Sequence, residues 1–288
     1  PGSGILPRTS ASGIFQSNDQ IVTNRAHNFV GGLTYAFGSN ISNNLVVNYS
    51  DFVNAIDPAT VGVPEIRLNP EQDWRSGTNA VAPQDTPQKR FQLRDDVTWV
   101  KGNHTFNFGA NYERTSIGGT FTFANPTRIR LFATDAAGNT LPLNTEADFL
   151  NLYVRDFSFG IGDANLPFNH DGNTINNRIS FYGGDAWRIR PNFTINYGIA
   201  YRWDSNLWNH DLARPQIIAP LFEKGTAPSG RDNNNWAPRV GFAWDPFSDG
   251  KTVVRGGFGL YYDNTIDNLR LFERADLGPV GAEQFLVG

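Results

Sequence analysis

Residues 236–264, WAPRVGFAWDPFSDGKTVVRGGFGLYYDN, decide the fold that this sequence predicts. Two stretches alternate large apolar residues with polar or small ones, and a polar turn at residues 245–251 joins them. Because successive side chains of a strand point to opposite faces, each stretch predicts a β-strand with one apolar face. The apolar set is Trp236, Val240, Phe242, Trp244, Val254, Phe258, Leu260 and Tyr262, and the other set is Arg239, Gly241, Ala243, Asp245, Val253, Arg255, Gly257, Gly259 and Asp263.

The length and the ends of these two arms favour strands that cross a membrane. Each arm is about nine to eleven residues long, which matches a tilted strand across a bilayer. Strands of soluble proteins average about five or six residues. Aromatic residues stand at both ends of each arm, as in the aromatic girdles of outer-membrane barrels. The stretch therefore predicts a hairpin of a membrane β-barrel.

The composition agrees with a barrel and argues against several other classes. Of the 288 residues, 39% are hydrophobic and 13% aromatic. No run approaches the roughly 18 apolar residues of a membrane-spanning helix, whereas a barrel strand needs apolar residues only at alternate positions. The net charge is -4, whereas proteins that bind nucleic acid usually carry an excess of positive charge, so we expect no nucleic-acid partner. The absence of cysteine excludes disulfides and thiolate metal sites.

Three further hairpins are predicted at about residues 27–53, 90–114 and 178–204, in addition to 236–263. The clearest alternation sets Ile195, Tyr197 and Ile199 against Asn196 and Gly198. Two aspartates, Asp95 and Asp185, fall among the apolar positions. Either a β-bulge turns each of them toward the polar face, or the register differs there.

The connectors alternate between short and long. Short turns are predicted at residues 38–44, 100–104, 188–192 and 245–251, and long loops at 54–89, 115–177 and 205–235. Outer-membrane barrels have short periplasmic turns and long extracellular loops. The sequence thus predicts an all-β fold, an antiparallel transmembrane barrel sheet of about eight strands. The expected membrane-interface aromatics are Trp99, Trp187 and Trp244 on the periplasmic side, and Trp203, Trp236 and Tyr262 on the other.

Four segments resemble the barrel region of Oar-like TonB-dependent receptors, which are outer-membrane proteins that often carry a carboxypeptidase-regulatory-like domain. They are LRDDVTWVKGNHTFNFGANYER at 93–114, ADFLNL at 147–152, ISFYGGDAWRIRPNFTINYGIAYRWD at 179–204 and NNWAPRVGFAWDPFSDGKTVVRGGFGLYYD at 234–263. The resemblance implies a barrel of about 22 strands in the outer membrane of a Gram-negative cell. It also implies uptake of a bulky nutrient driven by the TonB complex.

The resemblance further implies that residues 1–288 are part of one barrel domain, an internal fragment. We expect no signal peptide, plug domain or TonB box within it. The implied partners are outer-membrane lipid, the remainder of the barrel and its plug, the TonB complex and an extracellular ligand that the sequence does not identify. The alternative is a structural or adhesive surface protein without energised transport. A soluble β-sandwich shares the alternation but does not explain the long strands, aromatic rims and one-sided loops together.

Charged residues of the polar face are the candidate site. Glu113, Arg202, Asp204, Arg239 and Arg255 are expected in the lumen, first as supports of the barrel wall and second as ligand contacts. His170 with Asp171, and Asp204 with Asp211 near His210, offer oxygen ligands for calcium, but neither set has EF-hand spacing. No nucleophile stands near a base at a recognisable spacing. We therefore predict no catalytic residue, no cofactor site and no metal site, and a protein that is not an enzyme.

Overall fold

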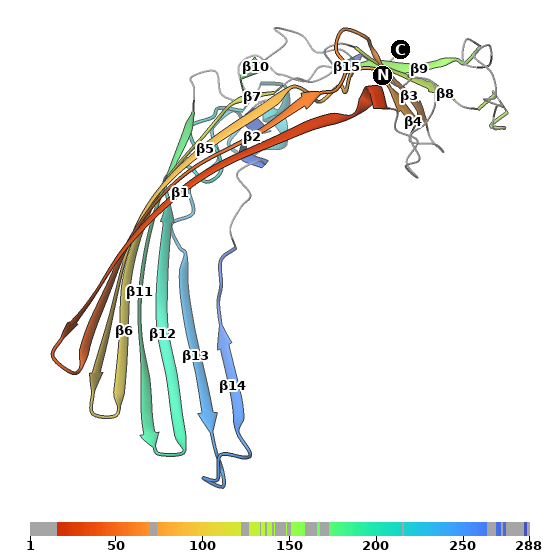
Figure 1. Cartoon of the computed structure of the whole chain (residues 1–288). Coiled ribbons are helices and arrows are strands. Elements are labelled where there is room, and N and C mark those ends of the chain that lie inside the picture. The colour runs from red at the N-terminus through yellow and green to blue at the C-terminus, as the bar shows by residue number, and fades with distance from the viewer. Residues whose placement is uncertain are drawn as a thin grey trace.

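The computed structural model describes residues 16–69, 74–121, 127–132, 134–135, 137–139, 141, 148, 151–158, 166–167, 173–214, 216–263, 269–271, 273–274 and 285–286. Two sheets organise these residues. In the first, eight long strands run side by side, with tight turns at one end and long connections at the other (Figure 1). The eight are β1 (Gln20–Phe37), β2 (Ile41–Pro58), β5 (Gln84–Lys101), β6 (His104–Ile117), β11 (Thr174–Arg190), β12 (Phe193–Asp204), β13 (Trp236–Trp244) and β14 (Val254–Gly259).

Every neighbouring pair among these eight strands is antiparallel. Their order is β1-β2-β5-β6-β11-β12-β13-β14, so consecutive hairpins lie side by side. Two short strands, β7 (Thr120–Phe121) and β10 (Leu166–Pro167), extend the sheet beside β5. Within this part of the chain, β1 and β14 each have one long neighbour, so the sheet is open at both edges.

The register places the apolar residues on one face. Residues directly opposite each other in an antiparallel sheet share a face. One such row joins Phe37, Ile41, Trp99 and Phe106 across the first four strands. Many of these apolar side chains are exposed, for example Phe29 at 66% and Phe181 at 54%. A soluble protein seldom exposes so continuous an apolar surface, and this face is the one suited to lipid.

The predicted alternation of short and long connectors is confirmed. The hairpin turns occupy residues 38–40, 102–103, 191–192 and 245–253. Gly38 and Gly102 have φ angles of 68° and 59°, a left-handed conformation that glycine adopts readily in tight turns. The connections between hairpins, residues 59–83, 118–173 and 205–235, all begin and end at the other end of the sheet.

Several strands are longer than the sequence predicts. β1, β2 and β5 each have 18 residues, more than the about 9–11 that cross a bilayer. β5 even contains Pro87, opposite Val53. The carbonyl of Pro87 accepts a hydrogen bond from Gly118 N, on the β6 side. The missing N–H of Pro87 points to the same side, so the pairing with β2 loses no hydrogen bond. β14, in contrast, ends at Gly259, so Leu260 and Tyr262 lie beyond the strand.

The second sheet corrects the prediction that residues 54–89 and 115–177 form only loops. Its strands are β3 (Glu65–Asn69), β4 (Trp74–Ser76), β8 (Arg128–Phe132), β9 (Val154–Ser158) and β15 (Phe285–Leu286), in the order β15-β9-β8-β3-β4. It lies at the same end of the long strands as their long connections (Figure 1). We call it the loop sheet.

A buried ion pair holds the loop sheet together. Arg128 Nε lies 3.1 Å from Glu65 Oε1 across the parallel pair β3 and β8, and the other carboxylate oxygen of Glu65 accepts from Ala80 N at 2.7 Å. Burial lowers the pKa of Arg128, and the nearby Glu65 carboxylate opposes that shift. Leu68, on the other face of β3, is fully buried. Part of the long connections is therefore ordered structure.

No helix in the described portion of the chain is long and apolar enough to cross a membrane.

Candidate functional site on the polar face

All five predicted lumen residues lie on the face opposite the apolar one. Glu113 is opposite Arg178, which is opposite Asp204. Arg202 is opposite Ser180, Arg239 is opposite Gly198, and Arg255 is opposite Ala243. The structure thus places them on one face, but Arg239 on β13 and Arg255 on β14 lie apart from the other three.

Glu113, Arg202 and Asp204 belong to an ion-pair network near the long-loop end of the sheet. Arg178 donates to Asp204 at 2.9 Å and to Glu113 at 3.3 Å. Arg202 donates to the second oxygen of Asp204 at 2.7 Å, and Asn176 donates to its first oxygen at 2.8 Å. Asp204 is thereby the centre of the network, with a side chain only 7% exposed. The network joins β6, β11 and β12.

We expect Arg178→Leu to cost about 2 kcal/mol of unfolding free energy, because charge-assisted hydrogen bonds contribute roughly 1.5–3 kcal/mol. The substitution leaves Glu113 and Asp204 without the guanidinium that joins them. Arg188→Leu is the matched control, since it removes the same charge from an exposed position of the same strand. Guanidine titration of the protein in phospholipid vesicles measures the unfolding free energy of both variants. Equal losses of stability would contradict the role of the network.

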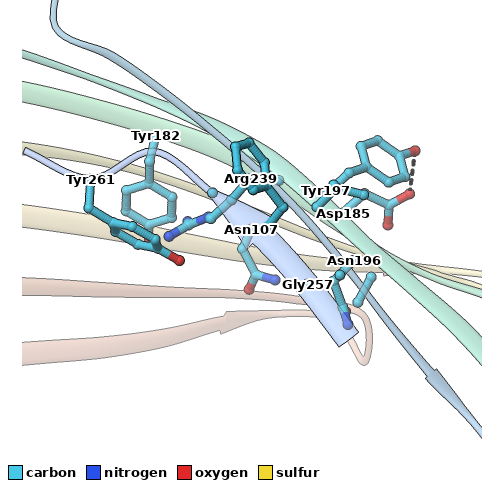
Figure 2. A pocket seen from close by; sticks show the side chains of 14 residues that line it. Asn107, Tyr182, Asp185, Asn196, Tyr197, Arg239, Gly257 and Tyr261 are labelled. Carbon is cyan, nitrogen blue, oxygen red and sulfur yellow. Dashed lines mark hydrogen bonds between the residues drawn. The ribbon is translucent and has the colours of Figure 1, made fainter. Parts of the chain in front are cut away.

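Arg239 lies half-way along the sheet, where the polar face is hollowed. This wall hollow has a volume of about 410 Å³ and is lined on the polar face by Asn107, Tyr182, Asn196, Arg239 and Tyr261. Figure 2 shows Tyr182, Tyr261 and Arg239 grouped at one end of it. Tyr182 also donates a 2.7 Å hydrogen bond to Asp96, which Arg94 holds from the other side at 2.8 Å.

Small residues make the floor of the wall hollow. Gly184, Gly241 and Gly257 line it, and Gly198 stands directly opposite Gly184. A Cβ atom at Gly198 would lie 2.8 Å from the carbonyl oxygen of Gly183 and 3.0 Å from Cα of Gly184. From the sequence, the mid-strand pairs Gly183-Gly184 and Gly256-Gly257 favour close packing or barrel curvature, but Gly198 is not distinguished.

We expect Gly198→Ala to cost about 1–3 kcal/mol, the usual range for overpacking, because the new methyl group meets main-chain atoms that cannot turn aside. Gly31→Ala on β1 is the control, since a Cβ there meets nothing within 4 Å. Guanidine titration in vesicles compares the two variants. A loss at Gly31 as large as the loss at Gly198 would show that strand propensity, and not the close contact, sets the effect.

The two aspartates that interrupt the pattern stay on the apolar face, so neither of the two explanations offered for them, a bulge or a different register, holds at these positions. Pairing runs without a register shift through Asp95 and through Asp185. Asp185 lies opposite Phe106 and Tyr197, and its side chain is 3% exposed. It accepts hydrogen bonds from the Tyr197 hydroxyl at 2.9 Å, drawn in Figure 2, and lies 2.7 Å from His104 Nδ1.

Asp95 is satisfied in the same way by a polar neighbour on its own face. Asn43 donates to it at 2.5 Å from the neighbouring strand β2. Side chains of adjacent strands thus satisfy Asp95 and one oxygen of Asp185, whereas Asp185 Oδ1 is buried without a hydrogen-bond partner among the described residues. Sequence parity identified both aspartates as exceptions, but the partners that satisfy them lie far away in the sequence.

A second hollow, the mouth hollow, opens where β12 and β13 meet their long connection. Its volume is about 540 Å³, and its lining includes Arg202 and Asp204 from the ion-pair network. The remaining lining residues are Leu207, Trp208, His210, Asp232, Asn235, Tyr262, Asp263 and Leu269. The sequence predicts Tyr262 at the membrane interface, and no pattern in it distinguishes Trp208 or Asp232.

Contacts of Arg270, Glu273 and Arg274 hold one wall of the mouth hollow in place. Arg270 donates to the carbonyl of Asn206 at 2.8 Å, and Arg274 donates to Asp211 at 2.9 Å. Asn209 donates to Glu273 at 2.7 Å. Burial by itself raises the pKa of Asp211, but hydrogen bonds from Arg274 and Asn206 outweigh it and hold that pKa below its ordinary value. The wall is therefore fixed by charged contacts between two loops.

The five predicted interface tryptophans lie on the apolar face by register. Trp99 is opposite Phe106, Trp187 opposite His104 and Trp244 opposite Phe193, all near the short turns. Trp203 and Trp236 are opposite Ile179 and Tyr201 near the other end. Their anchoring role in a bilayer remains a prediction.

The calcium candidates divide into two sets. His170 and Asp171 lie outside the described residues. Asp211 accepts from Arg274, and His210 Nδ1 lies 2.8 Å from the carbonyl oxygen of Ser229. Among the residues that the structure describes, no three His, Cys, Asp or Glu side chains are grouped so as to hold a metal ion.

This architecture is similar to that of known proteins. The family described as "Outer membrane beta barrel domain" matches residues 5–284. No curated protein sequence matches the chain. The outer membrane transporter YddB from Escherichia coli has a similar structure, with a TM-score of 0.50 and 13% identity over 88% of this chain. The copper transporter OprC aligns with a TM-score of 0.37 and 11% identity over 86% of this chain.

The chain is much shorter than these two transporters, since it covers 28% of YddB and 32% of OprC. At such low identity the likeness to YddB concerns the fold. The family match, in contrast, extends over nearly the whole chain and agrees with the eight-stranded antiparallel sheet and its exposed apolar face. The chain belongs to the outer membrane β-barrel domain family and is a protein of the outer membrane.

Proposed function

We propose that the chain is part of a TonB-dependent, Oar-like receptor that takes up a bulky nutrient, and that its polar face lines the route of that nutrient. The observation that carries the proposal is the contrast between the two faces of one sheet. One face exposes aromatic and aliphatic side chains, and the other holds the ion-pair network and two hollows. A wide barrel with lipid outside and water inside requires this arrangement.

The open edges of the sheet support a barrel larger than these eight strands. Eight strands can close a small barrel, but here β1 and β14 are at the two ends of the strand order. Unpaired strand edges are unfavourable in a membrane, because main-chain groups find no water to replace their hydrogen bonds. We therefore infer that further strands complete a barrel of about 22, the size at which transporters enclose a plug.

Two experiments test the proposal. Reading the whole gene should reveal a plug domain and a TonB box. In cells, wild type should deplete a nutrient from the medium that neither a gene deletion nor a strain with inactive TonB depletes. An intact gene without plug and TonB box, or depletion that does not depend on TonB, would contradict energised uptake.

The loop sheet favours a second candidate, a structural or adhesive surface protein. Its buried Glu65–Arg128 pair fixes a surface at the long-loop end, where a contact with another cell would form. Under this alternative, deleting the gene changes cell aggregation or adhesion and leaves nutrient depletion unchanged.

A further inference from the structure

The mouth hollow has features of a binding site that membrane anchoring does not explain. Trp208 and Tyr262 both line it, yet they are 47% and 44% exposed. Both share the hollow with Arg202 and Asp204, which belong to the polar face. Lipid would touch the opposite face of the sheet, so these two aromatic side chains are exposed to the aqueous side. Exposed aromatic rings in a concave polar site are typical anchors of a ligand.

We propose that the mouth hollow binds a neutral saccharide, an inference that rests on the proposed uptake function and names its substrate class. A sugar ring offers an apolar face for an aromatic side chain and hydroxyl groups around its edge. The hollow offers both kinds of partner, since two aromatic rings stand beside carboxylate, amide and guanidinium groups. Its volume of about 540 Å³ falls in the range of roughly 300–1,000 Å³ that is usual for ligand sites.

The charges around the hollow disfavour an anionic ligand. Three aspartates, Asp204, Asp232 and Asp263, line it beside one arginine, Arg202, and a second arginine, Arg178, reaches Asp204 from outside the lining. A carboxylate or phosphate group would therefore meet an excess of negative charge.

The Asp204 carboxylate is also not available to a cationic ligand. Asp204 already accepts from Arg178 and Arg202 at 2.9 and 2.7 Å. Asp232 accepts from the main-chain nitrogen of Asn234 at 2.8 Å. A second full charge would have to compete with these bonds, whereas a hydroxyl group can donate to Asp204 Oδ2, which accepts from Arg202 and keeps a second lone pair.

The frame of the hollow is fixed before any ligand binds. Arg270 and Arg274 are 1% and 8% exposed and donate hydrogen bonds to Asn206 and Asp211. The Tyr262 hydroxyl donates to the carbonyl of Asn234 at 3.0 Å, which fixes the ring at the rim. A preorganised site loses less conformational entropy on binding and can therefore hold a weakly interacting ligand such as a sugar.

The test is a panel of neutral oligosaccharides, acidic oligosaccharides and basic peptides presented to the purified full-length protein, with hits measured by calorimetric titration. We expect at least one neutral oligosaccharide to bind, and Trp208→Ala to weaken that binding at least tenfold. Trp208→Phe should retain part of the affinity, which shows that the ring matters. Trp244→Ala, at an exposed tryptophan of the apolar face, should leave binding unchanged.

Three results would overturn the inference: no neutral oligosaccharide binds, only acidic oligosaccharides or basic peptides bind, or Trp208→Ala binds as tightly as wild type. The melting temperature of each variant shows whether it is folded. TonB-dependent depletion is a separate readout, so uptake without saccharide binding refutes only the ligand class. Saccharide binding without TonB-dependent depletion refutes the transport function and leaves the binding site standing.

Discussion

Replacing His104 with leucine is expected to destabilise the sheet by about 3 kcal/mol, the upper end of the usual cost of leaving a buried polar group without its hydrogen-bond partner, because the group left behind is a carboxylate. The reason is the position of Asp185. Its side chain is 3% exposed, in a row with Phe106 and Tyr197 on the face that meets lipid. Without His104, the carboxylate keeps, among the described residues, only the hydrogen bond from the Tyr197 hydroxyl. Because the Asp185 side chain is only 3% exposed, water has little access to replace the lost hydrogen bond.

The double variant His104→Leu with Asp185→Leu is the decisive control. It removes the carboxylate together with its partner, so most of the stability should return. Trp187→Leu controls for lost ring packing, because Trp187 stacks on His104 with centroids 5.3 Å apart. Guanidine titration in phospholipid vesicles measures the unfolding free energy of His104→Leu, of the double variant and of Trp187→Leu. A double variant no more stable than His104→Leu alone would show that packing, and not the unpaired carboxylate, causes the loss.

Ile199→Arg is expected to cost about 2–4 kcal/mol, the measured range for a basic side chain at the bilayer midplane of an outer-membrane barrel. Ile199 lies on the apolar face of β12 between Gly183 and Pro238, and it is 45% exposed. It is half-way between the turn at residues 191–192 and the far end of the strand. Arginine at this depth must desolvate its guanidinium or distort the bilayer around it.

Asn196→Arg is the matched control on the same strand. Asn196 is an exposed residue of the polar face and lines the wall hollow, where water can solvate a new charge. We expect its effect to stay within about 0.5 kcal/mol, as for ordinary surface substitutions. Similar costs at both positions would mean that the two faces of β12 have the same surroundings, which would contradict the account of the sheet.

The sequence alone predicted the four hairpins and which face of each is apolar. Alternation with period 2 is a local property, and aromatic residues such as Trp99 and Trp244 mark the strand ends. Strand extent was harder to predict. Pro87 in β5 is tolerated because its missing N–H points away from β2, which becomes visible only once neighbouring strands are known.

The loop sheet escaped prediction because its strands are short and pair over long distances. β3 and β8 have five residues each, too few for a clear alternation. One signal was present: the tripeptide Ile-Arg-Leu occurs at residues 66–68 and 129–131, and these two copies pair in register.

The candidate site was predictable in its face but not in its contacts. Parity alone placed Glu113, Arg202 and Asp204 together on the polar side. Arg178, which joins Glu113 to Asp204, was not singled out, because its role depends on the register between β6, β11 and β12. Trp208 was missed for another reason: it lies in a long connection, where no periodicity identifies a function.

Spin labels along β12 test the central claim most directly, and the absence of cysteine from these 288 residues makes single labelling sites simple to introduce. Labels at Ile195, Tyr197, Ile199 and Tyr201 should collide mainly with dissolved oxygen, which concentrates in lipid. Labels at Thr194, Asn196 and Ala200 should collide more with a water-soluble nickel chelate. We predict that the two accessibilities alternate with a period of two residues and in opposite phase. Equal accessibility on both faces, or the reverse phase, would contradict a sheet with lipid on its apolar face and water on its polar face.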